Sequence, residues 1–173
     1  MKSKIFMKIN IDLCVRNYNG GPCIKVYNNK KVLLQKRLSE KGNITLELED
    51  DFALPNKLII EHHGKNMKRD TQINSKGEII NDKGFFIHHI SFDDLVLNNE
   101  IYNFPFIKDT GEKILKNNYL GYNGKFVVDV DSDNIYQWHS RWQKSLVNAS
   151  PKYDYDDFKK EIFEGKELDQ LVY

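Results

Sequence analysis

The chain of 173 residues contains little alanine and little cysteine, and each shortage narrows the class of protein. Its only alanines are Ala53 and Ala149, whereas isoleucine, valine, tyrosine and phenylalanine are plentiful. Alanine favours helices, while β-branched and aromatic residues suit strands, so this balance argues against a helix bundle. Two cysteines, Cys14 and Cys23, are too few for a disulfide framework, and they would pair only if neighbouring strands placed them together.

An excess of one charge and a long apolar run are also lacking. The 26 basic and 25 acidic residues give a formal net charge of +1 and are spread along the chain. No basic block suggests a surface for nucleic acid, because Lys30 and Lys31 are expected at a solvated hairpin tip. No segment approaches the roughly 18 apolar residues of a membrane span. The sequence predicts a soluble protein, made in a reducing compartment, that binds neither nucleic acid nor a membrane.

The clearest pattern present is an alternation of apolar and polar residues near the start of the chain. Six apolar residues recur at every second position from Ile5 to Val15. This period of two indicates a long strand with one buried face. The strand should end in the segment 17–22, where two glycines precede Pro22.

Further strands follow at short spacing with polar turns between them. They are expected at 24–26, 32–34, 44–48, 58–63, 85–92 with an extension at 95–97, and 126–130, with weaker ones at 71–73 and 78–80. Residues 101–106 should form an edge strand or ordered loop because of Pro105. The segment 121–124 carries an Asn-Gly hairpin signal. This pattern predicts a mainly β fold, an antiparallel β-sandwich or jelly roll.

After residue 131 the period changes to that of a helix. Ile135, Trp138, Trp142 and Leu146 are spaced by three or four residues, and Ser132 or Asp133 can cap the start. A second helix is expected at 155–164, with Phe158 and Ile162 on its inner face. We therefore expect a sandwich domain at 1–131 and an appendage of one or two helices at 132–173, packed on the sandwich or on a partner.

Two clusters have the residue types of a metal site but not the spacing. Asp129, Asp131 and Asp133 have the spacing of the first three ligands of an EF-hand calcium loop. Such a loop needs glycine at its sixth position and glutamate at its twelfth, and here these are asparagine and serine, so helix capping is favoured. The pairs His62–His63 and His88–His89 lie in strand candidates, where adjacent side chains face opposite sides, and zinc would need further ligands. Cross-strand packing is favoured for both histidine pairs, and we predict no metal and no cofactor.

Catalytic motifs are absent from the sequence. It contains neither a nucleophile elbow nor a glycine-rich phosphate loop, and the two cysteines have no identifiable histidine context. Carboxylate pairs for glycoside hydrolysis could exist among 25 acids, and sequence alone does not locate them. We predict that the protein is not an enzyme and name no catalytic residue.

Aromatic side chains are the candidates for binding. Tyr18, Tyr119 and Tyr122 fall in or beside turns, where they could stack on sugar rings; the alternative is that they anchor loops against the core. Four residues of the helices are candidates for a partner interface, with packing on the sandwich as the alternative: Trp138, Trp142, Phe158 and Ile162.

Several runs of sequence resemble known proteins. Residues 17–22 and 24–27, after the first strand, resemble the opening of small β-sandwich proteins similar to carbohydrate-binding modules. Residues 76–83, 90–94 and 118–124 resemble uncharacterised proteins of tailed bacteriophages. The resemblance spans about residues 4 to 130. The abundance of lysine, asparagine and isoleucine suits the AT-rich genome of such a phage, and of many bacteria.

This resemblance implies a virion-associated structural protein, a capsid decoration or a tail or fibre component made in the host cytoplasm. Such a protein would act by attachment to other virion proteins or to itself as a homo-oligomer. The alternative is a carbohydrate-binding module that binds a glycan with its loop tyrosines. The sequence departs from calcium-dependent modules of that kind, since it has no clear acidic loop cluster for an ion.

Overall fold

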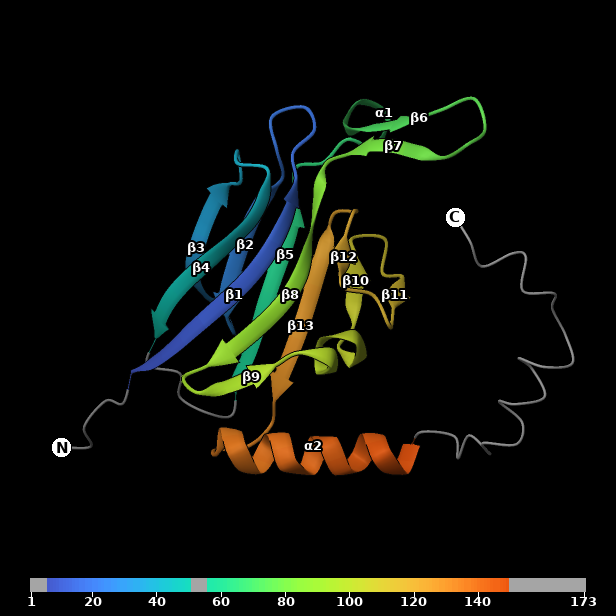
Figure 1. Ribbon diagram of the computed structural model, residues 1–173. Helices are drawn as coiled ribbons and strands as arrows, with labels where there is room; N and C mark the ends of the chain where they lie inside the picture. Colours follow the sequence, from blue (N-terminus) through green and yellow to red (C-terminus); the bar gives the residue numbers. More distant parts are fainter. Residues whose placement is uncertain (1–5, 51–55, 150–173) are drawn as a thin grey trace, which may run out of the picture. The chain divides into compact units, whose positions relative to one another are not determined.

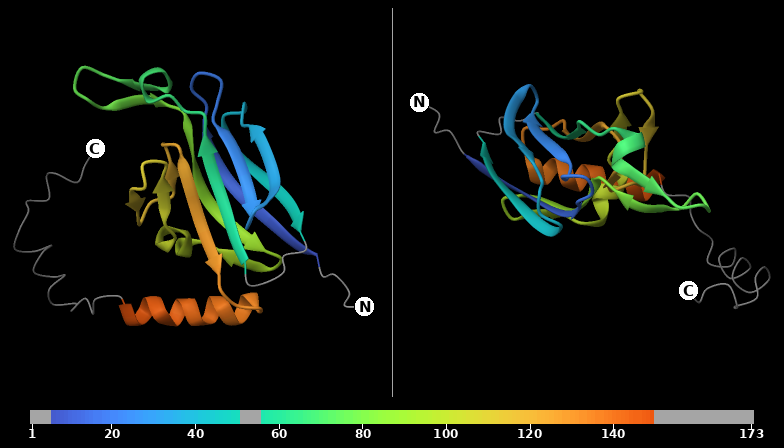
Figure 2. Two further views of the ribbon diagram at one scale, coloured as in Figure 1. Left: turned by 180° about the vertical axis from the view of Figure 1, so that it is seen from behind. Right: turned by 90° about the horizontal axis from the view of Figure 1, so that it is seen from above.

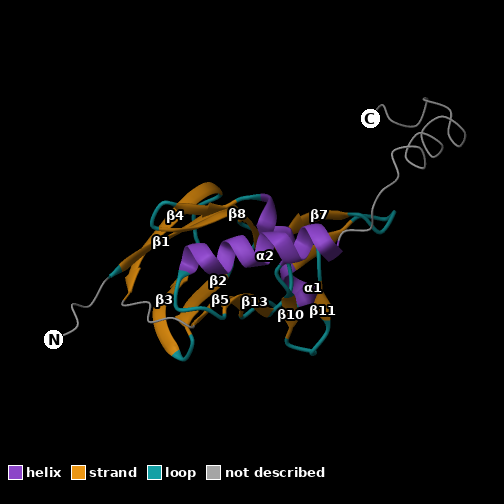
Figure 3. Cartoon of the chain, turned by 90° about the horizontal axis from the view of Figure 1, so that it is seen from below, coloured by secondary structure: helices purple, strands orange, loops and turns teal. Residues whose placement is uncertain are grey.

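The structure is a computed structural model that describes residues 6–50 and 56–149. The chain divides into two compact units, Met1–Tyr136 and Gln137–Tyr173, and each is considered by itself. The first unit holds all of the strands that the structure describes, in two main layers that Figures 1 and 3 show face to face. None of the described helices combines the length and the apolar character that crossing a membrane requires.

The first layer, sheet A, is an antiparallel sheet of five strands. Its order is β12, β8, β1 and β4, and β9 also pairs with β8. The strands are β12 (Tyr119–Leu120), β8 (Gly84–Phe92), β1 (Met7–Arg16), β4 (Gly42–Asp50) and β9 (Leu95–Leu97). The alternation at the start of the chain therefore becomes β1, the strand that β4 and β8 flank.

The second layer, sheet B, is an antiparallel sheet of six strands. Its order is β11, β10, β13, β5, β2 and β3. The strands are β11 (Lys113–Ile114), β10 (Phe106–Lys108), β13 (Gly124–Val130), β5 (Asn56–His63), β2 (Cys23–Asn28) and β3 (Lys31–Arg37). Cys23 thus lies in sheet B and Cys14 in sheet A, and both thiols are free.

The core lies between the two sheets. On β1, Ile9, Ile11 and Leu13 are buried, while the residues between them face outward. The His62 ring of β5 packs 5.5 Å from the Phe85 ring of β8, so side chains of the two sheets meet directly. Alternate residues of each strand thus face a shared apolar interior. The predicted mainly antiparallel β-sandwich is confirmed.

A third, two-stranded sheet projects from one end of the sandwich (Figures 1 and 2). It consists of β6 (Thr71–Ile73) and β7 (Ile79–Asp82), and the short helix α1 (Met67–Asp70) leads into it. The weak strands expected at 71–73 and 78–80 therefore form one hairpin. Three large apolar side chains on this hairpin are more than half exposed: Ile73, Ile79 and Ile80.

Two local predictions in the first unit have different outcomes. The segment 101–106, expected as an edge strand or an ordered loop, contains the end of the 3₁₀ helix η1 (Asn99–Asn103) and pairs as a strand only from Phe106, so it is an ordered connection over most of its length. The Asn-Gly segment 121–124 is not a hairpin, because β12 pairs with β8 whereas β13 pairs with β5. This segment instead carries the chain from sheet A to sheet B. The local turn signal is real, but it does not specify which strands pair.

The predicted amphipathic helix is α2 (Ile135–Ala149). Its cap differs from the prediction, since the side chain of Asn134 accepts a hydrogen bond from the backbone N–H of Tyr136 at 3.0 Å. Ser132 Oγ instead accepts from the Asn134 N–H at 3.3 Å, in the turn before the helix. The second helix expected at 155–164, with Phe158 and Ile162, lies outside the described residues.

Candidate functional site

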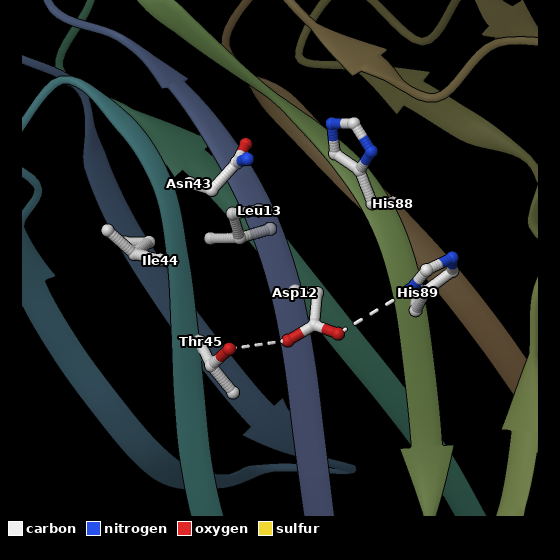
Figure 4. Close-up of a pocket in the computed structure, with 7 residues that line it drawn as sticks. All are labelled: Asp12, Leu13, Asn43, Ile44, Thr45, His88 and His89. Atoms are coloured by element: carbon white, nitrogen blue, oxygen red, sulfur yellow. Dashed lines mark hydrogen bonds and ion pairs between the residues drawn. The ribbon is translucent and has the colours of Figure 1, made fainter.

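A β-bulge in β8 places two histidines on the outer face of sheet A. Asp12 of β1 pairs with His89, but Leu13 pairs with Ile87, so His88 is an extra residue without a partner in β1. Both imidazoles are exposed and stand on the same outer face, as Figure 4 shows. The expectation that adjacent histidines face opposite sides is therefore wrong for this pair, because the bulge re-aims one side chain.

The two histidines help to line an open groove across three strands. Its cavity volume is about 310 Å³, near the lower end of the range for small-molecule sites, roughly 300 to 1,000 Å³. The lining residues come from β1, β4 and β8: Asp12, Leu13, Asn43, Ile44, Thr45, His88 and His89. The outward-facing members are polar, as expected for the solvent side of an antiparallel sheet.

A chain of polar contacts crosses the floor of the groove. Asp12 is directly opposite Thr45 on one side and His89 on the other. The Thr45 hydroxyl donates to Asp12 Oδ1 at 2.6 Å, and Nδ1 of His89 lies 3.5 Å from Asp12 Oδ2 (Figure 4). Asp12 of the central strand therefore accepts a hydrogen bond from Thr45 and brings its second carboxylate oxygen close to His89.

An aromatic pair stands beside this groove on the same sheet face. Phe86 of β8 and Tyr119 of β12 lie opposite each other with ring centroids 4.4 Å apart. The Arg16 guanidinium lies over both rings, at 5.2 and 5.4 Å from their centroids. Phe86 pairs in register with Cys14, which pairs in turn with Asn43 of the groove. Tyr119 thus borders the groove, although it does not line it.

The three candidate tyrosines do not form one platform on the groove. Tyr18 lies in the connection from β1 to β2, and Tyr122 lies between β12 and β13. The Lys108 ammonium nitrogen lies 4.1 Å from the centroid of the Tyr122 ring, covering one of its faces. The Tyr119 hydroxyl donates to Asp82, and burial together with that hydrogen bond raises the pKa of Tyr119. Their assignment as ligand-binding residues stays a prediction.

The two tryptophans proposed for a partner interface lie on α2. Trp138 and Trp142 are one turn apart, and their rings stack with centroids 6.1 Å apart and an interplanar angle of 17°. Phe158 and Ile162 lie beyond the described residues. The assignment of these four residues to an interface stays a prediction.

A buried network of charges at the base of the β6–β7 hairpin is the second polar cluster. The Lys65 ammonium contacts the carboxylate of Asp82 and the carbonyl of Gly121, and the Thr71 hydroxyl donates to Asp82 at 2.7 Å. Burial lowers the pKa of Lys65. Because the cations and carboxylates are paired and buried, this network fastens loops rather than presenting charge to a ligand.

Asp70 joins the same region from the end of α1. It accepts hydrogen bonds from the Asn19 side chain at 2.8 Å and from the Asn66 N–H at 2.9 Å, and it pairs with Lys83 at 3.1 Å. The adjacent Arg69 guanidinium holds the pKa of Asp70 far below its usual range. Across residues 6–50 and 56–149, no three histidine, cysteine or acidic side chains are grouped so that they could hold a metal ion.

Sequence reasoning missed the groove because its residues come from segments far apart in the chain. Asp12 and Thr45 are ordinary outward positions on their strands, and nothing in the local pattern marks either one. The adjacent pair His88–His89 was a usable signal, since a polar interruption in an otherwise apolar strand is typical of a bulge or an exposed edge.

Comparisons with known proteins give a distant structural likeness. No protein-family model matches the chain, and no curated protein matches it. One similar structure is vCBM60 in complex with galactobiose, with 10% identity, a TM-score of 0.47, and coverage of 70% of this chain and 97% of that one. Another is a selenomethionine form of vCBM60, from work on calcium-dependent carbohydrate-binding modules, with 8% identity, a TM-score of 0.48, and coverage of 71% and 90%. Both are carbohydrate-binding modules, and at these identities and scores the likeness assigns no function to this chain.

Proposed function

We propose that this chain binds carbohydrate, without transforming it, in the groove on the outer face of sheet A. The observation that carries the proposal is the array of hydrogen-bonding side chains that β1, β4 and β8 place around one open cavity. The carbohydrate-binding hypothesis from the sequence placed the sugar on the loop tyrosines, and the proposal here places it in this groove instead.

The chemistry of the groove suits a ligand rich in hydroxyl groups. Each sugar hydroxyl can donate and accept, so it needs partners of both kinds. The Asp12 carboxylate accepts, the Asn43 amide does both, and the imidazoles of His88 and His89 add further donors and acceptors. The groove is open to solvent, so a sugar can reach these side chains while the rest of its chain stays in solvent.

The groove is less suited to glycoside hydrolysis. That reaction uses two carboxyl groups on either side of the scissile bond, about 5 to 9.5 Å apart. Among the seven residues that line the groove, Asp12 is the single acid. It is engaged by Thr45 and lies beside His89, an arrangement that positions hydrogen-bonding groups. Binding without turnover is therefore the function that this geometry supports best.

The test is direct binding of the full chain to a glycan array, followed by calorimetry with the best ligand. Asp12→Asn should weaken binding by about tenfold or more, since hydrogen bonds to a charged group contribute roughly 1.5 to 3 kcal/mol. Thr45→Val should also weaken it, by removing one hydroxyl at nearly constant volume.

Asp129→Asn is the matched control. Asp129 is another half-exposed acid, paired with Lys57 at 3.0 Å across β13 and β5 of sheet B, so its removal should leave glycan binding unchanged. Tyr122→Ala distinguishes carbohydrate binding in the groove from carbohydrate binding by the loop tyrosines. Loss of binding in Tyr122→Ala with full binding in Asp12→Asn would move the site from the groove to the loops. Absence of any glycan ligand would refute the proposal.

Attachment to a virion, the first reading of the sequence, is not tested by the structure or the comparisons and stays a prediction. Its own measurement is whether the chain sediments in a fixed ratio with capsid or tail proteins of the source particle. Presence in such a particle would be compatible with glycan binding, because a surface component of a virion can carry a sugar-binding groove.

A further inference from the structure

The connection between β1 and β2 carries an asparagine–glycine pair at the surface. Asn19 and Gly20 are both exposed, and Asn19 has a φ of +52°, in the left-handed region. The Gly21 N–H donates to the Tyr18 carbonyl, so the pair lies at the centre of a tight turn. Glycine has no Cβ, and its backbone nitrogen is therefore the least hindered of all residues toward the side-chain carbonyl carbon of a preceding asparagine.

The sequence contains a second asparagine–glycine pair, Asn123–Gly124, in opposite surroundings. Asn123 Oδ1 accepts from the Lys65 N–H at 2.8 Å, and Asn123 Nδ2 donates to the Lys65 carbonyl at 2.9 Å. Gly124 is buried in β13, where a Cβ would lie only 2.4 Å from the Ile107 carbonyl oxygen. Both ends of the Asn123 amide are thus held against a glycine that has no room to move.

The Asn19 amide is held at one end. Its Nδ2 donates to Asp70 Oδ1 at 2.8 Å, and no group in the described part of the chain donates to its Oδ1. Rotation of the Asn19 side chain toward the Gly20 nitrogen therefore breaks one hydrogen bond, whereas the same rotation of Asn123 breaks two.

We propose that Asn19 is a site of spontaneous deamidation. The Gly20 nitrogen attacks Cγ of Asn19 and gives up its proton to solvent base. The bond from Cγ to Nδ2 breaks, and that nitrogen leaves as ammonia with a proton from water, which closes a succinimide ring. Water then opens the ring at either carbonyl and gives aspartate or isoaspartate, so water is the only co-reactant. This reaction is independent of carbohydrate binding in the groove.

The product would disturb the contact that holds this turn. Asp70 is fully buried and pairs with Lys83 at 3.1 Å, and deamidation would replace its Asn19 donor with a second carboxylate. Isoaspartate would also lengthen the backbone of the turn, next to the point where a Cβ on Gly21 would lie 2.0 Å from the Leu38 carbonyl oxygen. Deamidation should therefore release the connection between β1 and β2 from α1 irreversibly.

The experiment follows the full chain during incubation in warm, mildly alkaline buffer. Isoelectric focusing detects the added negative charge, and peptide mapping by mass spectrometry identifies the residue. Asn19 should convert progressively while Asn123, the internal control, stays intact. In urea both asparagines should convert, because the contacts of Asn123 are then lost. Conversion of Asn123 as fast as Asn19 in the native chain, or of neither, would overturn the proposal.

Variants test the chemistry and its consequence. Asn19→Gln, which would have to close a larger ring, should abolish the charge change, whereas Asn123→Gln should leave it as in the native chain. Asn19→Asp reproduces one product and should lower the melting temperature. Asn19→Gly, which suits the left-handed backbone and removes the hydrogen bond without adding charge, should lower it less. A charge change that persisted in Asn19→Gln would assign it to another residue, and equal melting temperatures of Asn19→Asp and the native chain would refute the release of the turn.

Discussion

His62 shows how much one side chain depends on its place in the sandwich. It faces the core from β5, is fully buried and packs on Phe85, while its neighbour His63 lies on the other side of the strand. Burial, with a contribution from the nearby Lys65 ammonium, lowers the pKa of His62 to about 4. The imidazole is therefore neutral in the native protein at neutral pH.

This lowered pKa predicts a loss of stability in mild acid. Below about pH 6.5 the unfolded chain binds a proton at His62, whereas the native state does so only near pH 4. Because the unfolded state binds more protons in that window, the free energy of unfolding should fall by about 2 to 3 kcal/mol as the pH drops through it. Urea denaturation of the native chain and of His62→Leu, at pH 7.5 and pH 4.5, measures the difference. Parallel pH dependences of the two proteins would contradict this assignment.

The pair Lys65–Asp82 gives a second prediction at the residue scale. Lys65→Met leaves a buried carboxylate without its cation and should lower the free energy of unfolding by roughly 3 to 5 kcal/mol. Adding Asp82→Asn to that variant should recover part of the loss, since the uncompensated charge is then removed. A double-mutant cycle in urea would measure the coupling; additive losses would mean that the two side chains do not interact.

The β6–β7 hairpin illustrates what an element contributes apart from its residues. A two-stranded hairpin is marginally stable by itself in water, and this one is held by the charged network at its base. The large apolar side chains of its outer part are all exposed: Ile73, Ile79 and Ile80. Stability therefore resides in the root of the hairpin and not in its projecting end.

The projecting end should be removable. The pairs Thr71–Asp82 and Gln72–Asn81 form the base of the ladder, so replacing residues 73–80 with Asn-Gly would close it with a two-residue turn. We expect the free energy of unfolding to change by less than about 1 kcal/mol, because the deleted side chains are solvated in the native state. A large drop in melting temperature would show that the outer hairpin is packed. Glycan binding should be unaffected, since none of the deleted residues lines the groove.

At the level of elements, the strands could be read from the sequence and their pairing could not. Alternation on β1 and β4 reports one buried face, which any partner strand would satisfy. Which strands pair depends on connections such as residues 121–123, whose turn signal is the same for a hairpin and for a crossing between sheets. The groove could not be predicted from the sequence for the same reason, because it depends on the pairing of β8 with β1 and on the bulge that makes His88 the extra residue.

The chain divides into two compact units, and the groove proposed to bind carbohydrate lies in the first of them. The sequence places a boundary after residue 131, and the chain divides after Tyr136. Every residue that lines the groove lies before that point. The sandwich should therefore be both the folding unit and the binding unit.

A chain that ends at Tyr136 tests this prediction. It should unfold cooperatively and bind the same glycan with an affinity within about twofold of the full chain, which is below 0.5 kcal/mol. Far-ultraviolet circular dichroism and calorimetry are the measurements. A fragment that folds but does not bind would place part of the site in residues 137–173, and a fragment that does not fold would show that the sandwich depends on them.

The end position of β3 in sheet B has a consequence for the protein in concentrated solution. An edge strand presents unpaired amides and carbonyls, which can recruit a strand from another molecule. The cations at Lys36 and Arg37 make such edge-to-edge addition between identical copies unfavourable, because like charges would face each other. Replacing Lys36 and Arg37 with glutamine would remove this repulsion. The doubly substituted protein should therefore begin to self-associate at a lower concentration than the native chain.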